Sequence, residues 1–549
     1  MQREHYDALV VGAGFSGLYM VYRLRQLGLS VLGFEAGADV GGTWYWNRYP
    51  GARCDAESLV YSYSFSKELR QEWRWSERFA TQPEILKYLQ HVADRFDLRQ
   101  HFQFNTRVKA AVFDEAQSQW QLTTEQGARV SARFCFMATG CLSIGRIPNI
   151  PGLENFQGEH YHTGNWPHQG VDFTGQRVAA IGTGSSGIQA IPLIAQQAAQ
   201  VTVLQRTPSF SVPARNQPLS DDYIARFNDN YDEIRHLARR QEIIGSGDVA
   251  PDPADSPRMS AQVAALSLPD EQRQQAYEAR WNHGGAYIVG TFADLMVDEN
   301  ANRTVADFVR GKISEIVKDP ETARKLTPTD YPLGAKRICV DTDYYATFNR
   351  DNVTLVDLRA NAIECITSTG VKLQSGEEIH ADAIVFATGF DAMTGALSSI
   401  DIVGEQGLKL RDRWVAGPRT YLGLQSAGFP NLFMITGPGS PSVLSNVVIS
   451  IEQHVDWLVD LVKHMRANGI EQIQPTVAAE DEWVQHVNDI ANATLFRLPN
   501  SWYLGANIPG KPRVFMPYAG GTGPYRDTCD KIAAENYRGF VLGRASTPA

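Results

Sequence analysis

Apolar and polar positions follow a recognisable order at the start of the chain. Residues 6–11 (YDALVV) form a short apolar run that ends in glycines, residues 16–27 place apolar side chains at helical spacing, and residues 29–34 (LSVLGF) form a second apolar run. Short apolar runs rich in β-branched residues favour strands, whereas apolar positions three and four apart favour a helix. The pattern therefore predicts a strand–helix–strand unit.

The same order of elements returns later in the chain. Residues 177–181 (RVAAI) and 201–204 (VTVL) are predicted strands, and residues 186–197 between them have helical spacing. Two further predicted strands share one ending, at residues 134–140 (FCFMATG) and 383–389 (AIVFATG). Repeated strand–helix–strand units imply parallel sheets with helices on both faces. We predict an α/β fold with two Rossmann-like dinucleotide-binding domains.

Other stretches differ from this repeat. Residues 83–96 and 447–465 predict amphipathic helices, and residues 113–124 predict antiparallel strands around Trp120. Residues 221–328 are polar and mostly helical in pattern, with a loop at residues 245–257. We interpret them as a helical insertion within the second dinucleotide domain. The tail from residue 500 onward is rich in glycine, proline and aromatic residues and predicts folded loops.

Residues 420–451 contain no charged side chain, which raises the question of a membrane span. Glycines and prolines interrupt this stretch repeatedly, and a spanning helix needs about 20 predominantly apolar residues with its backbone groups satisfied. A buried, loop-rich segment at an active site fits the pattern better. We therefore expect no contact with a membrane.

Composition narrows the classes of function. The chain has 549 residues, of which 43% are apolar and 20% charged, as in an ordinary globular protein that can bury a large cofactor. A formal net charge of −10 argues against nucleic-acid binding. No pair of the six cysteines has the spacing C-x-x-C, which excludes zinc ribbons and a redox dithiol of the thioredoxin-reductase type. We expect reduced thiols, no metal site and a cytoplasmic location without a signal peptide, and the sequence favours no particular oligomeric state.

The first chemical motif lies between the first predicted strand and helix. Glycines there permit a tight turn and let the backbone approach a pyrophosphate at the helix N-terminus. Glu35 ends the second strand, where a carboxylate can bind ribose hydroxyls. We assign FAD to this site, against the alternative of an incidental glycine-rich turn. The motif consists of Gly12, Ala13, Gly14, Phe15, Ser16 and Gly17.

The second motif occupies the matching place in the later unit. Here the second strand ends at Gln205, Arg206 and Thr207 instead of an acid. A guanidinium binds a 2′-phosphate with forked hydrogen bonds, whereas a carboxylate would repel it. We assign NADPH to this site, with a structural salt bridge of Arg206 as the alternative. Two such sites imply hydride transfer from nicotinamide to flavin. The motif consists of Gly182, Thr183, Gly184, Ser185, Ser186 and Gly187.

Three further segments carry a resemblance. One is Phe156-x-Gly158-x-x-x-His162-x-x-x-Trp166-Pro167, just before the second motif. Another is Gly41-Gly42-x-Trp44-x-x-x-x-Tyr49-Pro50-Gly51-x-x-x-Asp55, and the third is Lys336-Arg337. With these segments the chain resembles type I Baeyer–Villiger monooxygenases over residues 6–543, nearly its whole length.

The resemblance implies a reaction and a set of roles. The family uses FAD, NADPH and O2 to convert ketones to esters or lactones through a C4a-peroxyflavin. It implies that Arg337 stabilises the negative charge that develops, with Asp55 as its carboxylate partner; a plain surface ion pair is the alternative for both. The rival functions are oxidation of nitrogen or sulfur atoms, which needs no peroxide anion, and a non-catalytic flavin- and NADP-binding redox sensor.

The resemblance also implies further cofactor contacts. Lys336 matches a second ligand of the 2′-phosphate, and Trp502 matches a tryptophan of a mobile loop that packs over NADP. Trp44, Tyr45 and Trp46 are expected to form a wall at the flavin ring or to pack in a core. His162 and Trp166 are expected to couple domain movement to catalysis or to pack between domains. The other expected cofactor contacts are Gly42, Thr43, Arg53, Asp55, Tyr61, Val108, Gln189, Arg337 and Val447.

These assignments divide the chain into five segments. Residues 1–140 form the first part of an FAD-binding domain, and residues 381–549 form its second part with C-terminal loops. Residues 141–220 hold a linker and the first part of the NADPH-binding domain, and residues 331–380 hold its second part. Residues 221–330 form the helical insertion.

Overall fold

The computed structural model describes residues 5–240 and 263–544. Its largest sheet has eight strands in the order β17-β4-β5-β6-β1-β2-β3, and β18 pairs with β6. β1 is parallel to β2 and β6, as the N-terminal pattern predicts. The strands are β1 (His5–Val11), β2 (Val31–Phe34), β3 (Phe102–Gln103), β4 (Val108–Asp114), β5 (Gln119–Thr124), β6 (Arg129–Met137), β17 (Asp401–Val403) and β18 (Leu432–Met434).

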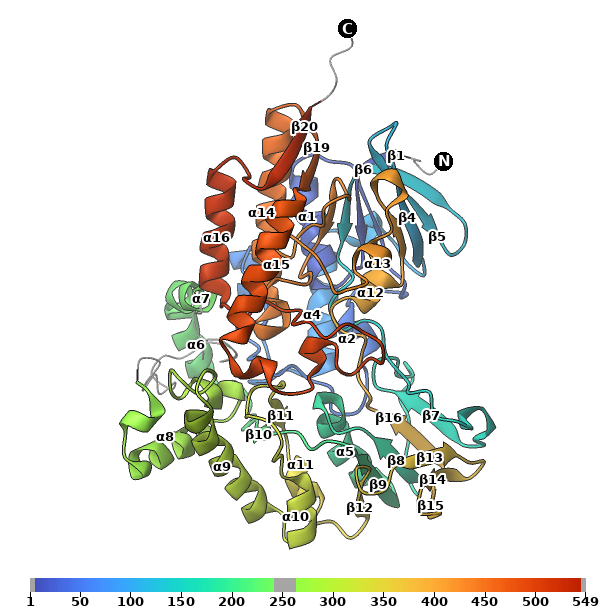
Figure 1. Cartoon of the computed structure of the whole chain (residues 1–549), viewed down its shortest axis with the longest axis vertical. Helices are drawn as coiled ribbons and strands as arrows, with labels where there is room; N and C mark the ends of the chain where they lie inside the picture. Colours follow the sequence, from blue (N-terminus) through green and yellow to red (C-terminus); the bar gives the residue numbers. More distant parts are fainter. Residues whose placement is uncertain (1–4, 241–262, 545–549) are drawn as a thin grey trace.

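The second large sheet has five strands in the order β12-β9-β8-β16-β7, and every pairing in it is parallel. Figure 1 shows the eight-stranded sheet in the upper part of the molecule and this sheet at the lower right. The two sheets confirm the prediction of two dinucleotide-binding folds. The strands are β7 (Glu159–His162), β8 (Arg177–Ile181), β9 (Gln200–Gln205), β12 (Val353–Asp357) and β16 (Ala383–Phe386).

In each large sheet, the strand that leads into the glycine motif is followed directly by a helix. We call the two glycine motifs the first and the second fingerprint. α1 (Phe15–Gln26) follows β1, and α5 (Ser185–Gln197) follows β8. The long helix α14 (Val447–Ala467) packs against α1, and its buried face includes Ile451, Val455 and Leu458. The apolar spacing predicted all three helices because each turns a continuous apolar stripe toward the core.

The described parts of the insertion, residues 221–240 and 263–330, are mostly helical, as expected, and lie in the lower part of Figure 1, mainly at the left. Three of these helices begin at residues whose side chains cap the first turn, namely Ser220, Asp298 and Asp319. The predicted loop at residues 245–257 lies outside the described residues. The helices are α6 (Asp221–Asp229), α7 (Tyr231–Arg239), α8 (Asp270–His283), α9 (Glu299–Ile316) and α10 (Pro320–Leu326), with the 3₁₀ turn η4 (Ala286–Gly290) between α8 and α9.

Two expectations need correction. β16 pairs with β8 and β7 in the five-stranded sheet, so the return to the first unit lies after Phe386 and not at residue 381. The tail is more regular than folded loops, because it contains α16 (Thr522–Ala534) and β20 (Phe540–Arg544). Gly521, Gly523 and Pro524 hide the start of α16 in the sequence, although proline is tolerated in the first turn of a helix.

Shorter elements complete the chain and position the site. The predicted strands around Trp120 are β4 and β5, which pair antiparallel. Residues 420–451 are mostly buried and loop-rich, as predicted. The remaining helices and strands are α2 (Thr43–Trp46), α3 (Lys67–Glu72), α4 (Gln82–Arg95), α11 (Tyr344–Thr347), α12 (Gly395–Ser398), α13 (Leu410–Arg413), α15 (Val477–Asn492), β10 (Ser211–Pro213), β11 (Cys339–Asp341), β13 (Ile363–Ile366), β14 (Gly370–Leu373), β15 (Glu378–His380) and β19 (Ile470–Pro475).

The structure also bears on membrane spans, metal sites and disulfides within the described residues. Within residues 5–240 and 263–544, no helix is both long and apolar enough to cross a membrane. The described residues contain no group of three or more His, Cys, Asp or Glu side chains that could hold a metal ion. The six cysteines, all within the described residues, form no disulfide with one another.

Candidate active site

A cavity of about 990 Å³ is lined by residues of both strand–helix–strand units. Cofactor and small-molecule sites occupy about 300–1,000 Å³, so this cavity is at the upper end of that range. Most of the predicted contacts line it: Gly12, Gly14, Phe15, Ser16, Glu35, Gly42, Thr43, Trp44, Trp46, Arg53, Asp55, Tyr61, Val108, Ser185, Ser186, Gln189, Arg337, Val447 and Trp502. Its described lining does not include Gly17, Tyr45, Thr183, Gly184, Gly187, Arg206, Thr207 or Lys336.

The first fingerprint joins β1 to α1, and its glycines are required by close backbone contacts. Gly12 has a φ of +109°, and a Cβ there would lie 2.4 Å from the carbonyl oxygen of Ala138. A Cβ on Gly17 would lie 1.8 Å from the carbonyl oxygen of Gly12. No side chain fits at such distances. Gly17 therefore allows the helix to pack on the turn, although it does not face the cavity.

The N-terminus of α1 is open to an anion. Gly14 is the N-cap, no side chain caps the first turn, and that turn contains no acidic residue. The first amide groups of a helix lack intrahelical partners and carry a partial positive charge. This end of α1 is therefore suited to a pyrophosphate.

Glu35 directly follows β2 and is only 5% exposed. Its Oε2 accepts a hydrogen bond from the amide of Ala13 at 2.8 Å, and its Oε1 accepts one from the amide of Gly37 at 2.7 Å. A carboxylate oxygen can accept more than one hydrogen bond. Glu35 thus supports the glycine turn and keeps acceptor capacity toward the cavity.

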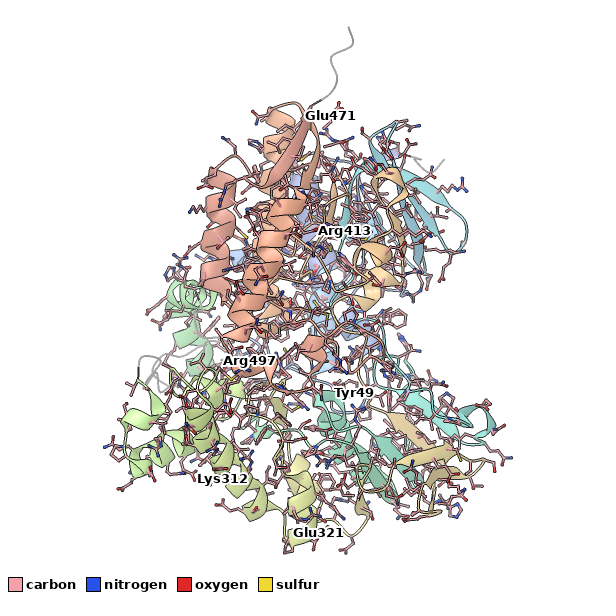
Figure 2. All side chains as sticks on the ribbon, viewed as in Figure 1. Tyr49, Lys312, Glu321, Arg413, Glu471 and Arg497 are labelled. Atoms are coloured by element: carbon pink, nitrogen blue, oxygen red, sulfur yellow. The ribbon has the colours of Figure 1, made fainter. Side chains whose placement is uncertain are left out.

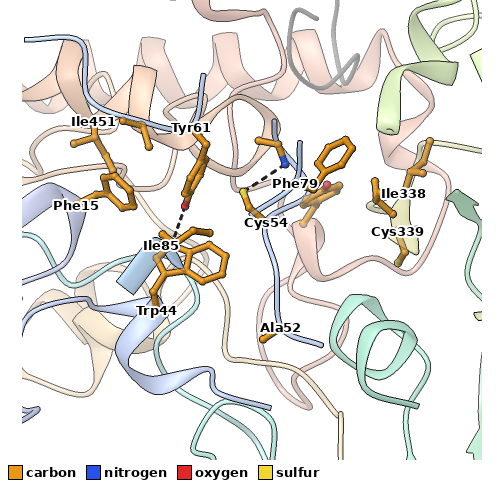
Figure 3. Close-up of a cluster of buried hydrophobic side chains, with 14 of the residues drawn as sticks. Phe15, Trp44, Ala52, Cys54, Tyr61, Phe79, Ile85, Ile338, Cys339 and Ile451 are labelled. Carbon is orange, nitrogen blue, oxygen red and sulfur yellow. Dashed lines mark hydrogen bonds between the residues drawn. The ribbon is translucent and has the colours of Figure 1, made fainter. Parts of the chain in front are cut away.

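Aromatic side chains form the wall beside the first fingerprint (Figure 3). The indole Nε1 of Trp44 donates to the hydroxyl of Tyr61 at 3.2 Å, and their rings meet edge to face with centroids 5.9 Å apart. Phe15 contacts Tyr61 edge to face at 5.3 Å. These contacts fix the ring planes that border the cavity.

Tyr45 differs from its two tryptophan neighbours, because it is absent from the cavity lining. Its hydroxyl accepts a hydrogen bond from the amide of Ala38 at 3.0 Å. Its ring fills the space beside Gly37, where a Cβ would lie 2.6 Å from the ring. Successive residues of a helical turn point in directions about 100° apart, so α2 cannot turn all three aromatic rings toward one cavity.

The second fingerprint repeats the geometry of the first. Gly182 has a φ of +109°, and a Cβ there would lie 2.4 Å from the carbonyl oxygen of Ala387. A Cβ on Gly187 would lie 2.3 Å from the carbonyl oxygen of Gly182. The two Ala-Thr-Gly endings are therefore structurally equivalent, since Ala138 and Ala387 each place a carbonyl oxygen against the first glycine of a fingerprint. α5 also starts without a side-chain cap or an acidic residue.

Two cationic side chains, Arg206 and Lys336, lie near each other outside the cavity. Arg206 is exposed at the end of β9, and Lys336 places its Nζ 4.2 Å from the ring centroid of Tyr331. Burial lowers the pKa of Lys336; nearby Asp330 raises it, while the charges of Arg206 and Arg359 lower it. Like charges held together in this way are relieved by an anion. Nearby, the hydroxyl of Thr183 donates to the carbonyl oxygen of Thr207 at 3.2 Å.

A loop of the first unit contacts α5 of the second, between the upper and lower parts of the molecule, where Tyr49 is labelled in Figure 2. The hydroxyl of Tyr49 donates to Oε1 of Gln189 at 2.8 Å, and Nε2 of Gln189 donates to the carbonyl oxygen of Arg53 at 3.2 Å. Burial raises the pKa of Tyr49 to about 12, so its hydroxyl remains a donor. Gln189 therefore joins the two units through both of its amide atoms.

Arg337 and Asp55 meet at the cavity from segments far apart in the sequence. The Nε and Nη2 atoms of Arg337 donate to Oδ2 of Asp55 at 3.0 and 2.5 Å, and Nη1 donates to the carbonyl oxygen of Val443 at 2.9 Å. The side chains are 35% and 23% exposed. Because guanidinium keeps its charge at any relevant pH, the pair places an oriented permanent cation at the cavity wall.

Val443 lies in a strained turn ahead of α14. The turn is the 3₁₀ helix η6 (Ser442–Leu444), and Ser442 has a φ of +33°, where residues other than glycine are rare. Asn446 caps α14 by accepting from the amide of Val448 at 3.1 Å. Strained backbone gathers at functional sites, and here it presents the Val443 carbonyl to Arg337.

Trp502 begins the 3₁₀ helix η8 (Trp502–Leu504) and lines the cavity. Its loop is attached to the segment after β16, because Nδ2 of Asn507 donates to the carbonyl oxygen of Phe390 at 2.7 Å and Lys511 pairs with Asp391 at 2.6 Å. The tryptophan is thus held against the cavity in this structure.

Tyr503 is a cavity residue that no sequence motif marks. This residue is 2% exposed and lines the cavity beside Arg337. Burial raises its pKa to about 12, although the charge of Arg337 lowers it. Only its place next to Trp502 could have pointed to it.

The linker residues separate into two environments. Trp166 is 2% exposed and packs against Tyr161 and Phe173, with ring centroids 5.4 and 6.2 Å apart. His162 lines the cavity and contacts Phe390 edge to face at 5.9 Å. Trp166 is therefore a core residue, while His162 connects the linker with the cavity.

Two dinucleotide-binding sheets in one chain, joined at a cavity with an oriented cation, define a two-cofactor oxidoreductase. A family model described as flavin-binding monooxygenase-like matches residues 7–218. Relatives narrow this class. A Baeyer–Villiger monooxygenase of Pseudooceanicola batsensis is 43% identical over 544 residues, which cover 98% of this chain and 97% of that protein.

Two further comparisons extend over nearly the full chain. Phenazine N-monooxygenase PhzNO1 of Lysobacter antibioticus is 42% identical and covers 98% of this chain and 97% of its own length. A solved structure, oxidized steroid monooxygenase bound to NADP, has a TM-score of 0.92 at 50% identity and covers 98% of this chain and 100% of that one. The chain belongs to the Baeyer–Villiger monooxygenases. The expectation of a flavin monooxygenase that uses FAD and NADPH is thereby confirmed.

Proposed function

We propose that the protein oxidises ketones to esters or lactones with O2 in this cavity, and that Arg337 is the catalytic cation. The observation that carries this proposal is the position of Arg337, which lines the same cavity as both fingerprints and is oriented by Asp55 and the Val443 carbonyl. Attack of an oxygen nucleophile on a ketone carbonyl develops negative charge on oxygen. A preorganised cation stabilises such charge.

The residues of the first site fit FAD. The uncapped N-terminus of α1 suits the pyrophosphate, and Glu35 suits a ribose. A Cβ on Gly14 would lie 3.3 Å from the Cα of Gly42, so two chain segments approach closely around this position without side chains. Reduced FAD, when bound, would supply the electrons that activate O2, and O2 would supply the oxygen atom that is transferred.

The residues of the second site fit NADPH. The N-terminus of α5 is uncapped, and Ser185, Ser186 and Gln189 face the cavity. Arg206 and Lys336 lie outside the cavity, where they suit the distant 2′-phosphate of the cofactor. Arg206 and Lys336 would hold the 2′-phosphate, while Ser185, Ser186 and Gln189 would hold the part of the cofactor that enters the cavity.

Within this site the chain's own side chains have separate tasks. Arg337 stabilises charge on the reacting oxygens, and Asp55 holds its guanidinium in one orientation. Trp502 and Tyr503 cover the cavity near Arg337 and limit the entry of water. Exclusion of water strengthens the interaction of the guanidinium with developing charge.

A substrate panel tests the proposal. We expect the FAD-loaded enzyme to consume NADPH faster with cyclohexanone, acetone or a ketosteroid and to form the matching lactone or ester, as measured by mass spectrometry. A tertiary amine and a sulfide serve as the parallel arm, because one relative is named for N-oxidation. N-oxide or sulfoxide formation without any ester would refute the proposal.

A further inference from the structure

A buried carboxylate lies two residues beyond Asp55 and takes no part in the proposed chemistry. The side chain of Glu57 is 2% exposed. Its Oε1 accepts hydrogen bonds from Nε and Nη2 of Arg78 at 2.9 and 2.6 Å and from the hydroxyl of Tyr287 at 2.8 Å. Its Oε2 accepts one from the hydroxyl of Tyr223 at 3.0 Å. Four donors converge on one carboxylate in the interior.

The partners of this carboxylate connect the first unit with the helical insertion. Tyr223 lies in α6, and Tyr287 lies in η4. Arg78 donates from Nη1 to the carbonyl oxygen of His283 at 2.6 Å and from Nη2 to its Nε2 at 2.7 Å. Burial, with the charges of Arg78 and Arg280, lowers the pKa of His283 to about 4, so the ring is a neutral acceptor.

The backbone around Asp55 is attached to the segment that carries Arg78. The amide of Cys54 donates to the carbonyl oxygen of Ala80 at 3.1 Å, and the amide of Ser58 donates to that of Arg78 at 2.8 Å. Figure 3 labels Cys54 and Phe79, one from each of these paired segments. Asp55 therefore lies between two backbone hydrogen bonds, at Cys54 and at Ser58, that join these two segments. The Glu57–Arg78 ion pair joins the same two segments through buried side chains.

The insertion also holds the segment that carries Arg337. Asn302, in α9, is 1% exposed, and its Nδ2 donates to the carbonyl oxygen of Leu333 at 2.8 Å. Its Oδ1 accepts from the amide of Leu333 at 2.9 Å. Leu333 lies four residues before Arg337. Both members of the Arg337–Asp55 pair thus approach the cavity from segments that are hydrogen-bonded to the insertion.

We propose that Glu57 is a positioning residue and that the helical insertion is the scaffold that sets the Asp55–Arg337 geometry. The inference rests on the proposed role of Arg337. A buried ion pair contributes little net stability compared with apolar packing, because desolvation opposes the attraction. Its fully satisfied geometry instead fixes the two segments in one register. The Glu57 network therefore acts on catalysis through the orientation of Asp55.

The first test replaces Glu57 by glutamine in the FAD-loaded enzyme. Glu57→Gln should lower the ratio of ester formed to NADPH consumed about tenfold, less than the roughly hundredfold cost of a 1 Å misplacement. It should also speed amide hydrogen exchange in residues 52–61, a readout independent of turnover. The matched control is Glu480→Gln, because Glu480 is 0% exposed, pairs with Arg413 and lies off the cavity (Figure 2 labels Arg413).

Stability separates positioning from simple support. Both variants should lower the melting temperature, but only Glu57→Gln should lower the ester ratio. Equal ester ratios in the two variants would overturn the inference. If Glu57→Gln does not fold, the double variant Tyr223→Phe/Tyr287→Phe removes the two hydroxyl donors of the insertion and leaves Arg78 in place. An unchanged ester ratio in that double variant would overturn it as well.

A double-mutant cycle with Asp55→Ala shows the route of the effect. If Glu57 acts through Asp55, Glu57→Gln should lower the ester ratio no further in the Asp55→Ala background. Additive losses would mean that Glu57 acts by another route and would contradict the inference. Failure of the proposed function has a different signature, since Arg337→Ala and Asp55→Ala would then themselves leave the ester ratio unchanged.

Discussion

The two fingerprint sites share one backbone design and differ in how the surrounding chain encloses them. In both, the first glycine has a φ of +109° and faces a carbonyl oxygen 2.4 Å from its ideal Cβ position. The two motifs differ in the space around their third residue, Gly14 in the first and Gly184 in the second. A Cβ on Gly14 would lie 3.3 Å from Gly42, whereas a Cβ on Gly184 would have no neighbour within 4 Å.

The side chains that follow the second strand of each unit, Glu35 and Arg206, also differ in how far they are enclosed. Glu35 is 5% exposed and receives two backbone hydrogen bonds, whereas Arg206 is exposed. The first site is therefore enclosed by the chain segment around Gly42, whereas the second site is open around Gly184. An enclosed site suits a cofactor that stays bound through many turnovers, and an open site suits one that must be exchanged.

The largest expected effect concerns the cation between the two sites. Arg337→Ala should retain FAD and still be reduced by NADPH, because neither fingerprint depends on this side chain. Ester formation should fall about 10²–10³-fold, the usual cost of removing one preorganised charge stabiliser. NADPH consumption should then yield hydrogen peroxide. The measurement is the ratio of ester to NADPH consumed, together with peroxide release.

Two companion variants sharpen that result. Arg337→Lys should rescue poorly, because an ammonium cannot reproduce the fork that contacts both Asp55 and the Val443 carbonyl. Asp55→Ala should show a milder defect, since the cation remains but loses its orientation. An ester ratio near the unmodified value in Arg337→Ala would remove the catalytic role from this residue.

The open site gives the next effect. Arg206→Ala should raise the KM for NADPH and leave NADH almost unaffected, because only NADPH carries a 2′-phosphate. Loss of one charge-assisted hydrogen bond costs about 1.5–3 kcal/mol, or roughly one to two orders of magnitude in affinity. Arg177→Ala is the control, since Arg177 is exposed at the opposite end of β8 and pairs with Asp382 at 2.7 Å. Equal use of both cofactors by the unmodified enzyme would refute the assignment.

A smaller effect concerns substrate size. Val443 lines the cavity in the strained turn that contacts Arg337, so Val443→Ala should admit bulkier ketones and raise their kcat/KM about tenfold, within the range that one or two methylene groups control. Val448→Ala is the control, because Val448 is 0% exposed and absent from the cavity lining. The control should lose stability and keep the substrate profile. Identical profiles for all three proteins would place the substrate elsewhere.

The sequence predicted the parts of the fold that rest on local patterns. Both strand–helix–strand units, the helical insertion and α14 follow from apolar spacing that one element carries by itself. β16 was assigned to the wrong unit because its Ala-Thr-Gly ending is the same as that of β6, and only pairing distinguishes them. α16 was missed because its first turn contains glycine and proline, whose local signal favours a loop.

The site shows the same division. The glycines and the Arg337–Asp55 pair could be named in advance because motifs or the family resemblance mark them. Tyr503 could not, since its importance comes from burial beside Arg337. For Tyr45 the sequence leaves two roles open, a wall at the flavin ring or core packing. A helical turn spreads successive side chains, and the ring of Tyr45 packs against Gly37. The Glu57 network has no local sequence signal, because its members come from two separate loops and from α6, α8 and η4.

The smallest effect tests the comparison between the two sites directly, with one methyl group added to matched glycines. Gly14→Ala forces a contact with Gly42 at 3.3 Å, so it should lower the melting temperature and speed the release of FAD, within the roughly 1–3 kcal/mol that overpacking costs. Gly184→Ala meets open space, and its φ of −84° suits alanine. Because alanine reduces the entropy of the unfolded chain by about 0.4–1 kcal/mol, this variant should melt at the same or a slightly higher temperature. Its KM for NADPH should rise, since the backbone there approaches the pyrophosphate. The measurement is melting of FAD-loaded and FAD-free protein for both variants. Equal destabilisation by the two substitutions would show that the second site is as enclosed as the first.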